Sequence, residues 1–266
     1  MKTYEIADAE NRMSVGTLLY YEKADRCVIE LVDGLDEWTA PLLFTGLVKK
    51  NVSTVPYEYS YLWVQERVIP YDRQNIQSIL KRHRLPQYDE MTLLELSEGR
   101  CSQDSLYIKK IDTLPDYVRK RAEKNVEECV ALENNILMCI FADGTIKKVD
   151  ISSLVEINDI KKIVSKQVFQ TAKVGAGGYA VVFNESLEIS ARTLYDKGET
   201  ISLSRDELML FVNRNLVDTS QTCEMLGCTR QNLSYLIGEK YILPIKENAK
   251  GNLYLRGEIC RSDLAK

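Results

Sequence analysis

The sequence is poor in the residues that metal sites and redox pairs need. It has a single histidine, His83, and its seven cysteines are scattered, with no Cys-x-x-Cys pair. Histidines and closely spaced cysteines are the usual zinc ligands, whereas scattered cysteines are typical of reduced thiols packed as small hydrophobes. We therefore expect no metal site and no cofactor. No triad or pair of carboxylates suited to catalysis stands out, so we do not expect an enzyme.

Long apolar segments and excess positive charge are missing as well. No apolar run approaches the ~20 residues of a membrane helix, and the N-terminus lacks the apolar core of a signal peptide. The composition, 45% hydrophobic and 28% charged with a net charge of −4, is that of an ordinary globular protein. We expect a cytoplasmic protein without membrane contact. Charge alone does not indicate a nucleic-acid-binding protein.

The most informative stretch is residues 218–237, whose pattern predicts two helices joined by a short turn. Thr219 or Ser220 can cap the first helix, and Glu224 lies within capping-box range of either. Gly227 falls where this helix must end in a left-handed conformation, which glycine adopts at little cost. Thr229 is the expected cap of the second helix. This order is typical of a helix-turn-helix.

The second helix of this motif has an apolar face and a polar face. Leu233, Leu236 and Ile237 follow helical spacing and are expected to pack inward. Arginine reads guanine edges in the major groove, and glutamine or asparagine reads adenine edges. A helix-turn-helix presents such side chains at the start of its recognition helix. The candidate DNA-reading residues are Thr229, Arg230, Gln231, Asn232, Ser234 and Tyr235.

Two short apolar runs then flank a polar turn, which predicts a β-hairpin over residues 241–255. Residues 218–264 resemble the winged helix-turn-helix of the MerR and excisionase families, through residues 219–226, Gly227-Cys-Thr-Arg-Gln-Asn232, Leu243-Pro244 and Leu253-Tyr-Leu255 before a last short helix. The hairpin would then be a wing that contacts phosphates or the minor groove through Lys246, Lys250 and Arg256. Alternatively, it only covers the helix pair through Leu243, Ile245, Leu253 and Leu255.

The charge of this region sets a condition on DNA binding. Residues 215–266 carry 7 Lys/Arg against 6 Asp/Glu. Because phosphate neutralisation supplies most non-specific affinity for DNA, a single copy should bind weakly. We therefore expect a homodimer that contacts two half-sites of double-stranded DNA.

Residues 135–200 predict a small α+β domain. Strands over 135–141 and 146–151 flank an Asp-Gly turn, and 159–169 follows helical spacing. A second hairpin spans 169–183 around Gly175-Ala-Gly-Gly178, which lacks the Gly-Lys-Ser/Thr ending of a phosphate loop. The region resembles a small bacterial α+β domain of unknown function that often accompanies helix-turn-helix modules, through Phe141-Ala-Asp-Gly144, Asp150-Ile-Ser-Ser-Leu154 and Leu194-Tyr195.

The N-terminal region predicts a mixed domain over residues 1–115. We expect strands over 16–21, 26–32 and 60–64, and helices over 41–48, 70–80 (capped at Asp72) and 88–96. Aromatic and polar residues around 57–75 suit stacking on a nucleic acid or peptide, or simply a capped helix over a half-buried strand. Cys101 beside Arg100 could be an activated thiol, although a buried structural cysteine fits better. A long polar helix over about 114–134 is expected to connect this domain to the next.

The sequence thus predicts a multi-domain α+β protein, with an N-terminal domain (1–115), a connecting helix (116–134), a small α+β domain (135–200) and a winged helix-turn-helix (201–266). The expected function is sequence-specific DNA binding by a bacterial transcription regulator, antitoxin-like or autoregulatory, with a protein partner held by the N-terminal domain. The alternative is an adaptor or inhibitor whose helix-turn-helix docks protein instead of DNA.

Overall fold

The computed structural model describes residues 1–157, 159–247 and 252–262. Helices and antiparallel sheets are both abundant, so the expected α+β class is confirmed. The chain divides into two compact units, Met1–Arg119 and Lys120–Lys266. Among the described residues, every helix is too short or too polar to cross a membrane.

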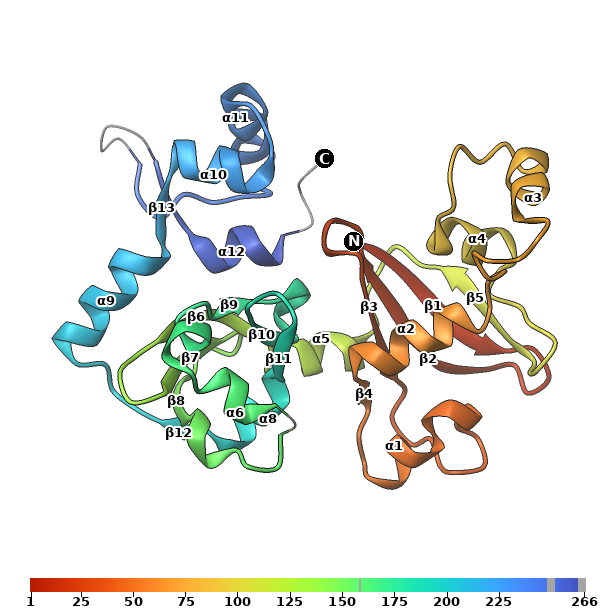
Figure 1. Ribbon diagram of the computed structural model, residues 1–266, viewed down its shortest axis with the longest axis horizontal. Helices are drawn as coiled ribbons and strands as arrows, with labels where there is room; N and C mark the ends of the chain where they lie inside the picture. The colour runs from red at the N-terminus through yellow and green to blue at the C-terminus, as the bar shows by residue number, and fades with distance from the viewer. Residues whose placement is uncertain (158, 248–251, 263–266) are drawn as a thin grey trace. The chain divides into compact units, whose positions relative to one another are not determined.

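The first unit is built on one antiparallel sheet of five strands in the order β4-β3-β2-β1-β5 (Figure 1). Its strands are β1 (Lys2–Asp8), β2 (Met13–Tyr21), β3 (Arg26–Leu31), β4 (Thr54–Val55) and β5 (Leu106–Lys110). Its helices are α1 (Thr45–Lys49), α2 (Tyr57–Gln65), α3 (Ile76–Arg82) and α4 (Glu90–Leu96), and α5 (Asp116–Ala122) begins here. The sequence indicated β2 and β3 but neither β1 nor β5, which pair with each other across about a hundred residues.

A helix replaces the predicted strand at residues 60–64. The alternating aromatic residues favoured a strand, but Ser60, Trp63 and Val64 are the buried positions of α2. Their spacing is that of one helix face. The helix expected over 70–80 is also shorter, because α3 begins at Ile76 after Asn75, and Asp72 does not cap it.

The polar residues near α2 have a structural role. The guanidinium of Arg67 is buried over the ring of Trp63, 3.9 Å from its centroid, and forms an ion pair with Asp104. Cys101 is partly exposed, not buried as expected, and its thiol lies 3.7 Å from a carboxylate oxygen of Asp104.

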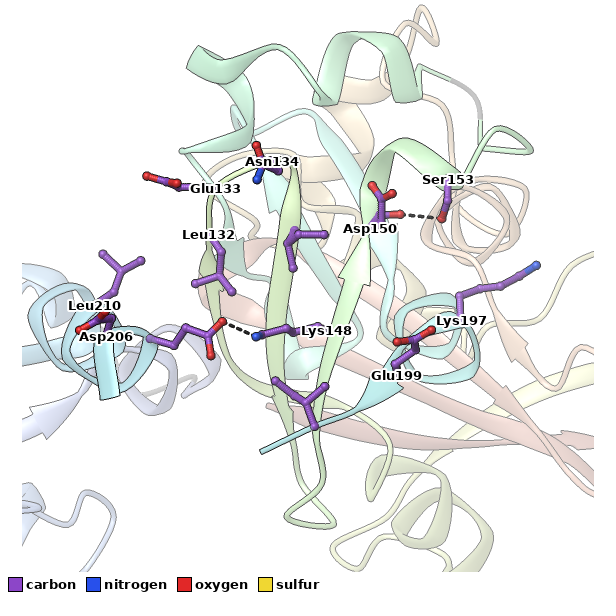
Figure 2. Close-up of a pocket in the computed structure, with 13 residues that line it drawn as sticks. Leu132, Glu133, Asn134, Lys148, Asp150, Ser153, Lys197, Glu199, Asp206 and Leu210 are labelled. Atoms are coloured by element: carbon purple, nitrogen blue, oxygen red, sulfur yellow. Dashed lines mark hydrogen bonds and ion pairs between the residues drawn. The ribbon is translucent and has the colours of Figure 1, made fainter. Parts of the chain in front are cut away.

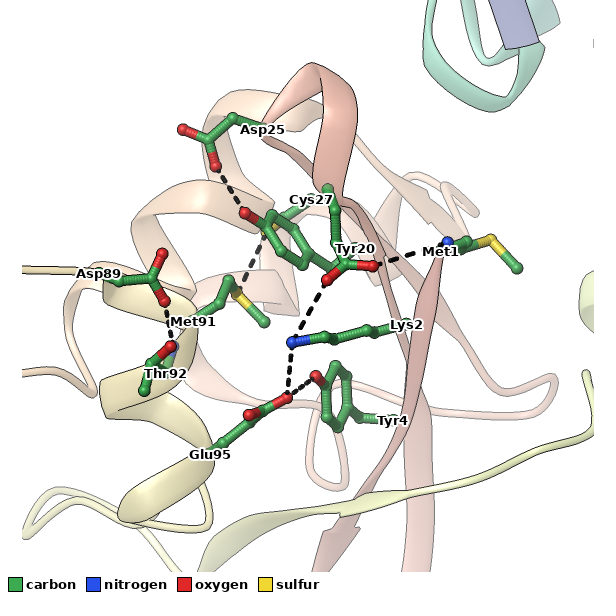
Figure 3. A network of polar contacts seen from close by, with 11 residues as sticks. Met1, Lys2, Tyr4, Tyr20, Asp25, Cys27, Asp89, Met91, Thr92 and Glu95 are labelled. Carbon is green, nitrogen blue, oxygen red and sulfur yellow. Dashed lines mark hydrogen bonds and ion pairs between the residues drawn. The ribbon is translucent and has the colours of Figure 1, made fainter. Parts of the chain in front are cut away.

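A polar cluster connects α4 to the inner strand β1 of the sheet (Figure 3). The Lys2 ammonium lies 3.4 Å from Glu22 and 3.3 Å from Glu95, and the Tyr4 hydroxyl donates to Glu95. Burial raises the pKa of Tyr4, so this phenol stays protonated and remains a donor. The cluster therefore has a structural role, which is to hold α4 against the sheet.

The second unit begins with two small sheets that enclose a common core (Figure 1). One sheet has the order β12-β8-β7-β6, with β6 (Val126–Ala131), β7 (Ile136–Phe141), β8 (Ile146–Asp150) and β12 (Glu199–Thr200). The other has the order β11-β10-β9, with β9 (Lys173–Val174), β10 (Ala180–Phe183) and β11 (Leu187–Ser190). Short helices complete it: α6 (Ile160–Ile163), α7 (Lys166–Phe169) and α8 (Ala191–Lys197).

The long connecting helix predicted over 116–134 is wrong beyond its first turns. Helix α5 ends at Ala122, and β6 follows as a strand paired with β7. The charged residues suggested a solvated helix, yet Glu128 is buried in β6 together with Val126 and Val130. The hairpin of β7 and β8 around Gly144, at φ 81°, is confirmed. The predicted helix over 159–169 is split into α6 and α7.

The C-terminal part of this unit contains the two helices and the turn that were predicted over residues 218–237. Its elements are α9 (Arg205–Asn215), β13 (Leu216–Asp218), α10 (Thr219–Leu226), α11 (Arg230–Gly238), β14 (Leu253–Leu255) and α12 (Arg256–Arg261). Leu226, Leu233, Ile242 and Tyr254 form its small core with Ile259 of α12. The helix α12 also packs on β6 and β9, so it joins this part to the two sheets.

Candidate DNA-binding surface

The first helix of the motif, α10, starts one residue earlier than its predicted caps. The Asp218 carboxylate accepts the backbone N–H of Gln221 at 2.8 Å, and the Gln221 side chain accepts the backbone N–H of Asp218 at 3.0 Å. This reciprocal pair is a capping box. The prediction of a cap at Thr219 or Ser220 with Glu224 is therefore wrong, because Asp218 caps the helix one residue earlier, with Gln221 as its partner.

The turn and the start of the second helix are as predicted. Gly227 ends α10 at φ 62°, and a Cβ there would meet no atom within 4 Å. Its role is therefore conformational, since only glycine adopts this backbone without strain. The Thr229 hydroxyl accepts the backbone N–H of Asn232 at 3.3 Å and caps α11. These contacts fix the direction in which α11 leaves α10.

One face of α11 is packed and the other is open. Leu233 and Leu236 are buried and Ile237 is partly buried. The open face carries Arg230, Gln231, Ser234 and Tyr235, the last 60% exposed. Asn232 differs from the expectation, because it is partly buried at the margin of the packed face. The open face therefore lacks one of the three adjacent polar residues expected at the start of the helix.

Arg230 is held across the turn of the motif. Its guanidinium donates to the Ser220 hydroxyl of α10 at 2.9 Å, and its backbone carbonyl accepts the Ser234 hydroxyl at 3.0 Å. Both partners are neutral and exposed, so the positive charge of Arg230 is not neutralised by these contacts. Such an arginine can exchange a hydroxyl for a phosphate or a base edge at small cost.

Of the hairpin predicted after α11, the described residues form one antiparallel bridge, between Lys246 and Leu253. The N–H of Ile245 donates to the carbonyl of Leu253 at 2.7 Å, and the N–H of Leu253 donates to Lys246 at 2.9 Å. Strand β14 in turn pairs with β13, with Leu253 opposite Asp218. Lys246 is exposed next to this ladder. Lys250, predicted for the tip of the wing, lies outside the described residues.

Arg256 lies elsewhere. It begins α12 at the end of β14 away from the hairpin turn, and it lines a cavity of about 10 Å³ with Glu128 and Asn215. Figure 1 shows α12 on the side of the two sheets and α11 on the far side of the motif. The structure thus does not bring Arg256 together with Arg230 and Lys246.

The apolar residues of the hairpin are placed one position away from the expectation. Ile242 and Tyr254 are fully buried, whereas Leu243 and Ile245 are 59% and 52% exposed. Tyr241, 58% exposed, and Tyr235 of α11 add to the exposed apolar area. The idea that Leu243 and Ile245 cover the helix pair is therefore wrong. These exposed side chains are the main feature of this surface that the sequence pattern did not indicate.

Comparisons with protein families, with curated proteins and with solved structures found no match for this chain. Within the described residues, no group of three or more His, Cys, Asp or Glu is placed to hold a metal ion. The functional argument therefore rests on the geometry of α10, α11 and the hairpin.

Proposed function

We propose that the C-terminal part of the chain binds double-stranded DNA in a sequence-dependent manner and that the protein is a transcription regulator. The observation that carries this proposal is the open face of α11. Its Arg230, Gln231 and Ser234 side chains stand on a helix whose start is fixed by Thr229 and whose angle to α10 is set by Gly227. A recognition helix in the major groove needs this combination of a rigid start and exposed polar side chains.

We further propose that the DNA-binding form is a homodimer. The near balance of charges over residues 215–266 gives one copy few phosphate contacts. Two copies bound to two half-sites make twice as many phosphate contacts, although the charge of each copy is unchanged. Light scattering at micromolar concentration tests this directly. A strict monomer that still binds one operator tightly would contradict it.

Selection of the full-length protein against random duplexes tests DNA recognition. We expect an enriched motif, and we expect Arg230→Ala to weaken binding to it by about 1–3 kcal/mol. Arg192→Ala is the matched control, because it removes the same charge from an exposed position on α8. Failure to enrich any motif with a correctly folded dimer would exclude sequence-specific binding.

The hairpin is expected to add affinity and not specificity. Lys246 is exposed beside the predicted tip, and phosphate contacts carry no base information. Lys246→Ala should therefore weaken binding to all duplexes alike and make the salt dependence shallower by about one unit. A loss confined to one sequence would mean that the hairpin reads bases.

A second candidate function is that of a protein-docking adaptor. The exposed Tyr235, Tyr241, Leu243 and Ile245 favour it, because large exposed apolar side chains are typical of protein interfaces. Two variants distinguish the two functions. An adaptor should lose its partner in Leu243→Ser with Ile245→Ser and tolerate Arg230→Ala, whereas a DNA-binding protein should respond most strongly to Arg230→Ala.

A further inference from the structure

The sheet formed by β12, β8, β7 and β6 has two different faces. Residues Leu137, Cys139 and Phe141 of β7 point into the core between the two sheets, and the alternate residues Ile136 and Met138 point to the other side. On that side the sheet is only partly covered, by Leu210 and Phe211 of α9. A groove of about 880 Å³ remains between α9, the end of β8 and the start of β12 (Figure 2).

The floor of this groove is aliphatic. It is made by Leu132 and Ile136 at the β6–β7 turn, by Ile201 after β12, and by Leu210 of α9. Three of these side chains are only partly buried. A ligand that covers them gains the free energy of removing apolar surface from water.

The rim of the groove is strongly acidic. Five carboxylates line it against two lysines. Lys148 forms an ion pair with Glu207, the fifth carboxylate, and Lys197 lies 3.2 Å from Glu156 outside the groove. Four exposed carboxylates remain that form no ion pair with a described Lys or Arg side chain: Glu133, Asp150, Glu199 and Asp206.

These four carboxylates come from four different segments of the chain. Glu133 lies in the β6–β7 turn, Asp150 ends β8, Glu199 starts β12 and Asp206 lies in the first turn of α9. Figure 2 shows them on both sides of the aliphatic floor, with Asp206 on α9 and with Asp150 and Glu199 across the sheet. A small ligand with one positive charge can satisfy only part of such a rim. An extended ligand with several positive charges can satisfy it on both sides.

We propose that this groove binds a basic amphipathic segment of a partner protein. Its aliphatic side chains would lie on Leu132, Ile136, Ile201 and Leu210, and its Lys or Arg side chains would face the four rim carboxylates. Complementary charge gives such a contact its specificity and its sensitivity to salt, and the apolar floor gives it affinity. The proposal does not depend on DNA binding, because the groove involves neither α10 nor α11.

Three synthetic peptides of equal length, added to the full-length protein and followed by calorimetry, test the proposal. One alternates Lys with Leu, one alternates Lys with Ser, and one alternates Glu with Leu. We expect micromolar binding of the Lys/Leu peptide, at least about tenfold weaker binding of the Lys/Ser peptide and no binding of the Glu/Leu peptide. Equal binding of the Lys/Leu and Lys/Ser peptides would overturn the proposal, because the floor would then be unused.

Variants of the groove residues test whether the peptide binds in the groove. Glu199→Gln with Asp206→Asn should weaken Lys/Leu binding by about tenfold, and Ile201→Thr should weaken it by about fivefold with little effect of salt. The matched control is Glu123→Gln with Glu185→Gln, which removes two exposed carboxylates of the same unit outside the groove. If this control weakens binding as much as the groove variants, attraction is diffuse and the proposal fails. A change in self-association of the groove variants would instead assign the groove to a second copy of the chain.

Discussion

Two helices, α9 and α12, connect the pair α10 and α11 to the sheets of the second unit. The contacts that hold them to the sheets differ in kind. At α12 the backbone of Gly257 approaches β6 so closely that a Cβ would lie 2.1 Å from the carbonyl oxygen of Glu127. The Gly257 N–H donates to the buried Glu128 carboxylate at 3.0 Å, and Arg261 donates to the Glu127 carbonyl. At α9 the apolar side chains Leu210 and Phe211 are only partly buried.

The contact at α9 combines this apolar packing with polar groups near the ends of the helix. Ser204 and Glu207 form a capping box, Glu207 forms an ion pair with Lys148, and Arg214 donates to the carbonyl of Ala131 at 2.8 Å. Such partly exposed polar contacts contribute little and tolerate change. The contact at α12 contains a close backbone approach and a desolvated acid, which tolerate almost none. We infer from this difference that changes at α12 disturb the position of the motif more than changes at α9.

A large effect is expected of Gly257→Ala. The added methyl group meets the Glu127 carbonyl and the Glu128 carboxylate, so α12 must move away from β6. We expect a loss of about 3 kcal/mol in the free energy of unfolding, measured in urea. Gly238→Ala in α11 is the control, because its methyl group meets no atom within 4 Å and alanine is the better helix former. Equal stability of the two variants would contradict a close contact at α12.

The second prediction concerns pH. Burial raises the pKa of Glu128 to about 7, in spite of Arg261 and the Gly257 N–H, which lower it. Among the described residues, one of its carboxylate oxygens has no hydrogen-bond donor, which agrees with a group that retains its proton. The pKa of Glu128 in the folded protein lies above the ordinary 4.5. Its contribution to the free energy of unfolding is therefore fully present below pH 4.5 and is lost as the pH rises to about 7.

Comparison with Glu128→Gln isolates this contribution. The variant cannot ionise at position 128, whereas Glu258, whose pKa burial also raises, remains in both proteins. The stability of the natural protein relative to the variant should therefore fall by about 3 kcal/mol between pH 4.5 and pH 8. Urea unfolding at four pH values measures it. A difference that is constant with pH would show that Glu128 is not desolvated.

A much smaller effect is expected at the ion pair of α9. The Lys148 ammonium holds the pKa of Glu207 at about 2, and both side chains are partly exposed. A double-mutant cycle of Lys148→Ala and Glu207→Gln, which keeps the capping box, should give a coupling of less than about 1 kcal/mol that decreases with salt. A salt-independent coupling of several kcal/mol would mean that α9 is held to the sheet as strongly as α12.

The smallest effect is expected on the outer side of α9. Leu208 and Met209 are 47% and 51% exposed, so Leu208→Ala and Met209→Ala should each change stability by less than about 0.5 kcal/mol. Ile259→Ala in α12, where the side chain is fully buried, is the contrasting measurement and should cost about 2–5 kcal/mol. Similar losses at all three positions would erase the distinction between the two helices.

Local patterns predicted the elements whose decisive contacts are local. The turn at Gly227 and the cap at Thr229 depend on neighbours within five residues, and the hairpin of β7 and β8 depends on Asp143-Gly144. Such contacts are determined by the preferences of a few residues for particular backbone angles. For that reason α11 could be expected from the sequence, with the choice of its exposed residues correct except at Asn232.

Long-range contacts decided the rest. Strand β1 finds its partner β5 about a hundred residues away, and β6 is a strand because it pairs with β7 and accepts α12, although its glutamates suggested a solvated helix. Nothing in the local sequence marks Gly257 as a point of close approach or Glu128 as a buried acid. The sequence by itself determined the turn at Gly227, the start of α11 after Thr229 and the hairpin at Gly144. Only the tertiary structure decided which charged residues lose their water, because desolvation depends on segments that are distant in the chain.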